Sequence, residues 1–192
     1  SAYSLDVASE TSVLYNGSIP NLSDVIIPIY EGWNWISYVP TTSYDINTAL
    51  VNLSPSNLDY IKGQTTSSTY YSSGGVWYPD ILLEPTKGYM LKSSSAQSLT
   101  YPSIESYTNN TFTRNNQTQS FNYRKFEFNA SATISIDMKH LKTSINDKIS
   151  VFYENELRGI AYGDICPLNN KLLFNLMLYS NNEQEEDFTF IY

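Results

Sequence analysis

The sequence is poor in the side chains that most enzymes use for acid–base chemistry and for metal binding. Its 192 residues include one cysteine, Cys166, and one histidine, His140. A single cysteine excludes an intrachain disulfide, and one histidine with one cysteine cannot form a zinc cage. His140 lies between two lysines at the end of a strand pattern, so we expect it to face solvent rather than to serve a catalytic triad. The chain is therefore not expected to be an enzyme.

Charged residues are also scarce, and most of them are acidic. They make up 16% of the chain, with 11 Lys and Arg against 19 Asp and Glu and a net charge of −8. Nucleic-acid binding needs clustered cations that neutralise phosphates, so no nucleic-acid partner is expected. No apolar run reaches the roughly 18 residues of a membrane helix, and the opening lacks the basic start and apolar stretch of a signal peptide. We expect no membrane insertion and regard the chain as a fragment or a protein with a removed leader.

The dominant pattern that is present is alternation of apolar and polar residues, which is typical of half-buried antiparallel strands. In the second half, short alternating runs are separated by turn-forming residues, which favours an Ig-like antiparallel β-sandwich over 121–192. The expected strands there are 125–130, 132–138, 149–154, 157–162, 172–179 and 187–192. Cys166 follows one of these strands and precedes a proline, so we expect it to be a small buried hydrophobic residue.

The first half is also rich in strand patterns and contains one helical pattern. Its expected strands are 25–30, 34–39, 58–63, 68–71, 76–78 and 88–92. Between them, 43–53 has apolar residues at helical spacing, with Ser43 or Asp45 available as N-cap, so we predict one short helix. Residues 103–120 have a polar, loop-like composition and are predicted to link a first module, 21–102, to the second. The fold class is therefore expected to be all-β, with two small modules.

The two ends of the first half resemble each other. Residues 2–15 align without a gap to 88–101, and Tyr and Leu recur at alternating positions. Self-similarity of this kind is typical of repeated modules. Two interpretations of residues 1–20 stay open: they are the closing strands of a preceding repeat, or they are N-terminal strands of the first module.

Particular motifs carry a resemblance to a known class of proteins. GWNW at 32–35 and KGYM at 87–90 frame a stretch, 31–93, that resembles a module recurrent in large secreted bacterial proteins, and the ELRG element at 156–159 resembles the Ig-like module that often follows it. The resemblance implies a non-catalytic extracellular or cell-surface module, attached to other domains of a multidomain enzyme, adhesin or surface protein. It implies no particular ligand.

Aromatic residues make up 15% of the chain and include 17 tyrosines, whose rings and hydroxyls suit a surface that binds sugars. Alternation places Trp33 and Trp35 on one face of a strand, and we expect that face to be core. Trp77 follows a glycine turn and is a candidate for an exposed aromatic strip. The candidate ligand-binding residues of this strip are Trp77, Tyr70, Tyr71 and Tyr78. The favoured alternative is that Trp77 closes the end of a small core.

Acidic residues near the ELRG element are candidates for a calcium site, because turns rich in oxygen atoms can bind calcium. The carboxylates concerned are Asp147, Glu154, Glu156 and Asp164. The favoured alternative is that Glu154 or Glu156 pairs with Arg158 and the other carboxylates are solvated. The acidic run 183–187 is expected to be a solvated turn. No cofactor is expected, apart from calcium as an option.

These observations lead to two functional hypotheses. The first is an extracellular adhesion or carbohydrate-binding module that uses exposed aromatic residues to bind a polysaccharide or a cell-surface glycan. The second is a structural spacer or surface-sorting module without a ligand of its own, since stacked repeats with buried tryptophans also fit the pattern.

Overall fold

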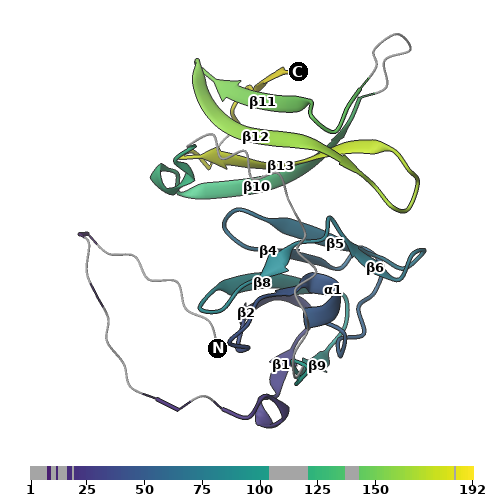
Figure 1. Ribbon diagram of the computed structural model, residues 1–192. Coiled ribbons are helices and arrows are strands. Elements are labelled where there is room, and N and C mark those ends of the chain that lie inside the picture. Colours follow the sequence, from purple (N-terminus) through teal and green to yellow (C-terminus); the bar gives the residue numbers. More distant parts are fainter. Residues whose placement is uncertain are drawn as a thin grey trace. The chain divides into compact units, whose positions relative to one another are not determined.

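The structure is a computed structural model (Figure 1), and its described part consists almost entirely of β-strands and loops. The described residues are 8–9, 12, 17–18, 20–103, 121–136, 143–183 and 185–192. The chain divides into two compact units, one made of Ser1–Gly63 and Ser68–Tyr107 and the other of Gln64–Ser67 and Thr108–Tyr192. The predicted all-β fold with one short helix is confirmed.

The first unit is built on a five-stranded antiparallel sheet with the strand order β2-β8-β4-β5-β6. Its strands are β2 (Gly32–Ser37), β8 (Gly88–Ser93), β4 (Tyr60–Lys62), β5 (Ser67–Tyr71) and β6 (Val76–Tyr78). Two short ladders accompany the sheet: β1 (Ile27–Ile29) with β9 (Gln97–Leu99), and β3 (Tyr44–Asp45) with β7 (Leu82–Leu83). A 3-10 turn, Leu22–Asp24, precedes β1.

One short helix covers part of this core. Helix α1 (Ile46–Ala49) begins after Asp45, whose carboxylate accepts a hydrogen bond from the Thr48 amide at 2.9 Å. This N-cap satisfies an amide that has no partner within the helix. The helix is shorter than the predicted segment 43–53, although Leu50 and Leu53 beyond its end are buried as the helical pattern requires.

The core of the first unit lies on one face of the sheet, where alternate residues of the strands point inward. Ile36, Ile61 and Leu91 come from three neighbouring strands and have no exposed surface. Their packing partners from the helix, the short ladders and the loops include Ile29, Ile46, Ala49, Leu83, Leu99 and Tyr101. Because side chains alternate along a strand, this leaves the other face of β2, β8 and β4 available to solvent.

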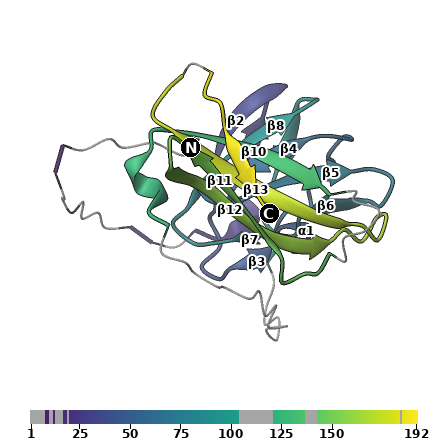
Figure 2. The ribbon, with the colours of Figure 1, turned by 90° about the horizontal axis from the view of Figure 1, so that it is seen from above.

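The second unit contains a five-stranded antiparallel arrangement in the order β10-β13-β12-β11-β14, of which β10 to β13 are labelled in Figure 1 and Figure 2. Its strands are β10 (Phe128–Ser135), β11 (Lys148–Tyr153), β12 (Glu156–Ile165), β13 (Leu172–Ser180) and β14 (Thr189–Ile191), and a 3-10 turn, Tyr123–Lys125, precedes them. The first part of β12 pairs with β11, while Gly163–Ile165 pair with β13. Strand β12 therefore belongs to two ladders, and the unit is sandwich-like around a core of Ile149, Val151, Ala161, Phe174 and Leu176.

One break between predicted strands of the second unit is wrong. The expected strands 125–130 and 132–138 are not separated by a turn, because β10 runs through residues 129–132 and pairs with β13 from Phe128 to Ser135. The side chains of Asn129 and Ser131 are compatible with a turn, but the continuous ladder to β13 satisfies the backbone of this segment instead. The turn predicted between β11 and β12 is present, with positive φ at Glu154 and Asn155.

Some predictions fall on residues that the structure does not describe. His140 and nearly all of the linker 103–120 lie outside the described residues, as do most of the positions 2–15 that align with 88–101. The later copy, 88–101, forms β8 and β9. Within the described residues, no helix is both long and apolar enough to span a membrane.

Buried tyrosines predict how the first unit responds to alkali. Burial raises the pKa of Tyr38, Tyr89 and Tyr101 above the ordinary value of 10.0. A raised pKa in the folded state contributes stability that is complete below about pH 10 and is lost as the pH rises further, because the unfolded chain ionises first. We expect the urea midpoint of the first unit to be constant from about pH 7 to about pH 9 and to fall by about pH 11.

The control for this prediction is a pair of Tyr→Phe variants. Tyr101→Phe should flatten the alkaline decline, whereas Tyr30→Phe, at a ring that is 67% exposed, should leave it unchanged. Equal slopes in both variants would contradict the assignment of the decline to buried tyrosines. Denaturation curves at each pH, followed by circular dichroism, provide the measurement.

Candidate functional site

A buried asparagine fixes the start of strand β2. The Asn34 side chain is 8% exposed, and its Oδ1 atom accepts a hydrogen bond from the Tyr30 amide at 2.8 Å. Its Nδ2 atom donates to the carbonyl of Tyr30 at 2.8 Å and to that of Gly32 at 3.0 Å. Gly32 has φ +92, a left-handed conformation that glycine adopts without strain. The polar atoms of Asn34 are thus satisfied inside the protein, which removes the cost of burying them.

The position of Asn34 decides which way the two neighbouring tryptophans point. Since Asn34 and Ile36 face the core, alternation along β2 turns Trp33 and Trp35 outward, and their exposed fractions are 50% and 53%. The prediction that the double-tryptophan face is core is therefore wrong. The alternation was predicted correctly, but the buried face is the one with the self-satisfied amide and the aliphatic residue.

Strand register places further side chains beside these tryptophans. Lys92 on β8 lies directly opposite Trp33 on one side and Tyr60 of β4 on the other. In the next row, Met90 lies opposite both Trp35 and Lys62. We call this surface the tryptophan face, and it consists of Trp33, Trp35, Tyr60, Lys62, Met90 and Lys92. It extends about 7 Å along the strands and about 10 Å across them.

Contacts between its members hold one tryptophan in place. The Trp33 and Tyr60 rings meet edge to face, with centroids 6.1 Å apart and an interplanar angle of 88°. The Lys62 ammonium lies 5.9 Å from the Trp33 ring centroid, within the range of cation–π attraction. A ring that is held by such contacts loses little conformational entropy when a ligand binds to it.

The candidate strip around Trp77 is not exposed. The Trp77 side chain is 4% exposed and packs on Tyr70, with ring centroids 5.4 Å apart. On the backbone, the Trp77 amide donates to Oδ1 of Asn47 at 2.8 Å and its carbonyl accepts from Nδ2 of the same side chain at 3.3 Å. Trp77 follows a turn, but alternation in β6 directs it into the core beside helix α1.

The other residues of that candidate strip are also withdrawn from solvent. Tyr78 is 5% exposed, and Tyr70 and Tyr71 are half-buried. Tyr70 lies opposite Trp77 in the β5–β6 ladder, on the core face. The sequence alternative, in which Trp77 closes the end of a small core, describes the structure.

Two of the carboxylates considered for calcium, Asp147 and Glu156, have other partners. Asp147 accepts hydrogen bonds from the Ser144 amide at 2.6 Å and from the Tyr192 hydroxyl at 2.5 Å, and the latter bond lowers the pKa of Asp147. Glu154 lies in the β11–β12 turn and Asp164 near the end of β12. In the part of the chain that the structure describes, no three His, Cys, Asp or Glu side chains gather into a group that could hold a metal ion.

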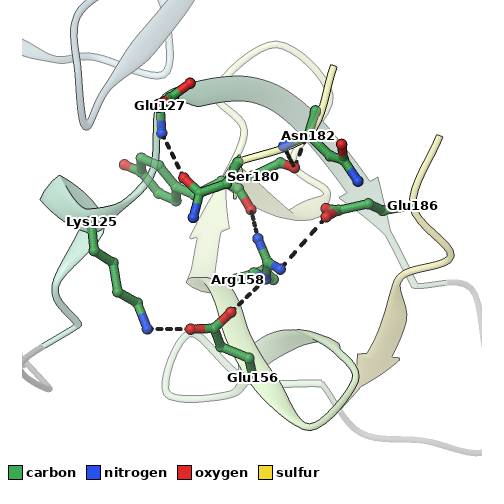
Figure 3. Close-up of polar contacts among 9 residues, drawn as sticks. Lys125, Glu127, Glu156, Arg158, Ser180, Asn182 and Glu186 are labelled. Carbon is green, nitrogen blue, oxygen red and sulfur yellow. Dashed lines mark hydrogen bonds and ion pairs between the residues drawn. The ribbon is translucent and has the colours of Figure 1, made fainter. Parts of the chain in front are cut away.

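Arg158 of the ELRG element forms the polar centre of the second unit (Figure 3). It is 6% exposed, and its Nη1 atom donates to the Tyr179 carbonyl at 3.3 Å. Its Nε atom lies 3.3 Å from Glu156 Oε2 and its Nη2 atom 3.5 Å from Glu186 Oε1. Glu156 also pairs with Lys125, whose hydrogen bond lowers the pKa of the Glu156 carboxyl. The expected pairing of Arg158 with a neighbouring glutamate is present, with Glu156 as the partner.

The expectation that the acidic run 183–187 is fully solvated is wrong at one residue. Glu186 is not solvated, because its side chain is 4% exposed and pairs with Arg158. The guanidinium lies between two rings, 4.9 Å from the Phe126 centroid and 5.2 Å from that of Tyr153. Cys166, as expected, is buried. Arg158, Glu156 and Glu186 therefore have a structural role, since each pairs with another residue of the same unit.

Comparison with protein-family models, with curated proteins and with solved structures gives no match to this chain. The resemblance to modules of secreted bacterial proteins therefore stays a prediction. The feature of the structure that bears on function is the chemistry of the tryptophan face.

The exposure of the tryptophans reverses their expected effects on stability. Trp77→Ala should destabilise the first unit by about 3–5 kcal/mol, because it leaves a cavity in the core. Trp33→Ala and Trp35→Ala should each cost less, about 1–2 kcal/mol, since half of each ring is already in water. Urea denaturation of the full chain measures all three, and a loss for Trp35→Ala as large as that for Trp77→Ala would contradict the placement of β2.

The ion pairs of the second unit differ in burial, so mutations that break them should differ in their effect on its stability. Arg158→Ala should destabilise this unit by about 3–5 kcal/mol, because it leaves the buried Glu186 carboxylate unpaired. The matched control is Lys125→Ala, which removes a cation from an exposed pair and should cost less than about 1 kcal/mol. Thermal unfolding of the two variants tests the difference, and similar losses would show that Arg158 is not the centre of the cluster.

Proposed function

We propose that the first unit is a non-catalytic carbohydrate-binding module, acting outside the cell or at its surface, and that the tryptophan face is its binding platform. The observation that carries this proposal is the half-exposed state of Trp33 and Trp35 on a regular strand. Each large apolar ring in water costs free energy that contact with a ligand recovers. Two half-exposed tryptophans on one face form an apolar patch of the kind that marks interaction sites.

The chemistry of the face suits sugars. A pyranose ring has a face of C–H groups, which carry slight positive charge, and the face of an aromatic ring carries slight negative charge. Hydroxyl groups around the rim of the sugar need polar partners, and the Tyr60 hydroxyl and the lysine ammoniums supply such atoms. Because Trp33 and Trp35 are two positions apart, roughly 6.7 Å along the strand, a chain of sugars can contact both.

The composition of the face favours a glycan over a protein partner. Protein interfaces have apolar centres in which lysine is depleted. Here Lys92 lies between Trp33 and Tyr60, in the middle of the first row. Its ammonium would lose water without compensation in a protein interface, whereas a hydrated glycan leaves it in a polar setting.

Binding of polysaccharides by variants of the full chain tests the proposal. Affinity electrophoresis on a panel of soluble polysaccharides should show retardation of the wild-type chain by at least one of them. Trp33→Ala and Trp35→Ala should each weaken that binding about tenfold, since an aromatic contact contributes roughly 1.4 kcal/mol. Both variants should remain folded at the temperature of the binding assay, with a melting temperature lowered by no more than about 10 °C.

The matched control is Phe190→Ala, which removes an aromatic residue that is 51% exposed on strand β14 of the second unit. It should leave glycan binding unchanged. If no polysaccharide on the panel retards the wild-type chain, the carbohydrate-binding proposal is wrong and the spacer hypothesis takes its place.

A further inference from the structure

The tryptophan face carries a charge opposite to that of the chain as a whole. The chain has a net charge of −8. The two side chains of this face that are ionised at neutral pH, Lys62 and Lys92, are both cationic. None of the residues that the described strands β2, β8 and β4 place on this face is acidic. A local reversal of charge on an acidic protein points to an anionic ligand, because potentials at a binding surface complement those of the partner.

The nearest carboxylate along strand β4 points away from this face. Asp59 is 2% exposed and precedes Tyr60. Its Oδ1 atom accepts hydrogen bonds from the amide and hydroxyl of Ser94 at 2.8 and 2.6 Å, and its Oδ2 atom accepts from the Ser56 amide at 2.9 Å. Its charge is thus compensated by donors on the core side of the sheet.

Each lysine lies next to a tryptophan. Lys92 is directly opposite Trp33 in the β2–β8 ladder. Lys62 shares a row with Trp35, separated from it by Met90, and its ammonium lies 5.9 Å from the Trp33 ring centroid. Both lysines therefore lie around the Trp33 ring, and Lys92 is also the diagonal cross-strand neighbour of Trp35.

We propose that the glycan bound by the tryptophan face is a uronate polysaccharide. This inference rests on the proposed function and names its ligand class. In a uronic acid the carboxylate is attached to the edge of the pyranose ring. When the face of that ring stacks on Trp33 or Trp35, the carboxylate projects sideways, where the ammoniums of Lys92 and Lys62 form charge-assisted contacts with it.

A polynucleotide also combines flat rings with anions, but the observations favour the glycan. Binding of single-stranded nucleic acid needs a cationic groove that follows the phosphates over several nucleotides. The tryptophan face supplies two lysines on a chain of net charge −8. That number suits occasional carboxylate contacts better than a continuous phosphate track.

The test compares each charged polymer with its neutral form. Isothermal titration of the full chain uses polygalacturonate, alginate and hyaluronan, each beside its methyl-esterified derivative, with single-stranded oligodeoxythymidine as a further ligand. We expect binding to at least one uronate polymer and binding at least tenfold weaker to its methyl ester. We also expect affinity to fall when salt is raised from about 0.1 M to about 1 M, as the screening length shortens from about 10 Å to about 3 Å.

Variants that remove one positive charge test whether Lys62 and Lys92 contact the carboxylates of the ligand. Lys62→Gln and Lys92→Gln should each weaken binding to the uronate polymer up to about fivefold and should weaken binding to the methyl ester by a smaller factor, since glutamine still donates hydrogen bonds to hydroxyl groups. The matched control is Lys148→Gln, at an exposed lysine of strand β11 in the second unit, which should have no effect. The melting temperature of each variant checks that it is folded.

The outcomes separate the two proposals. Equal affinity for a uronate polymer and its methyl ester overturns the charge inference and leaves carbohydrate binding in place. If none of these uronate polymers binds but a neutral polysaccharide binds through Trp33 and Trp35, the charge inference is also overturned and carbohydrate binding is kept. Tighter binding of oligodeoxythymidine than of every glycan overturns both proposals, and so does the absence of binding to any polysaccharide.

Discussion

The first unit depends on a buried amide that makes its shortest hydrogen bonds within its own turn and a longer one, at 3.4 Å, to the Leu91 carbonyl on strand β8. Asn34 pairs with the backbone of Tyr30 and Gly32, so it can lie in the core without unsatisfied polar atoms. A shift of strand β2 by one residue would expose this amide and bury two tryptophans, because side chains alternate along a strand. The hydrogen bonds of Asn34 therefore set the register of β2, and with it the chemistry of the outer face.

The sequence predicts most elements of this fold, because alternation and turn residues are local signals. It places strands at or within a few residues of β2, β5, β6, β11 and β13, and it predicts α1 with Asp45 as one of two possible N-caps. The long ladder of β10 is missed, because Asn129 and Ser131 favour a turn locally and only the pairing with β13 keeps them extended. Such pairing is decided by residues far away in the chain.

The candidate site illustrates a different limit. Alternation divides GWNW into two faces but does not say which face is inside, and general burial statistics favour tryptophan over asparagine there. The signal that decides the matter is the glycine with positive φ two residues before Asn34, which lets the chain fold back onto the amide. For Trp77, the neighbouring turn suggested exposure, whereas Asn47 and the β5–β6 ladder hold it in the core. The tryptophan face is an outcome of register across three strands, which no short window contains.

The cluster around Arg158 has a mechanical consequence for the second unit. Strand β14 pairs with β11 through only three residues, Thr189–Ile191. Immediately before it, Glu186 is joined to Arg158 in the middle of the unit. Tension applied at the C-terminal strand would separate that short ladder first and would then fall on the buried ion pair, which would oppose further separation of the C-terminal segment from the rest of the unit.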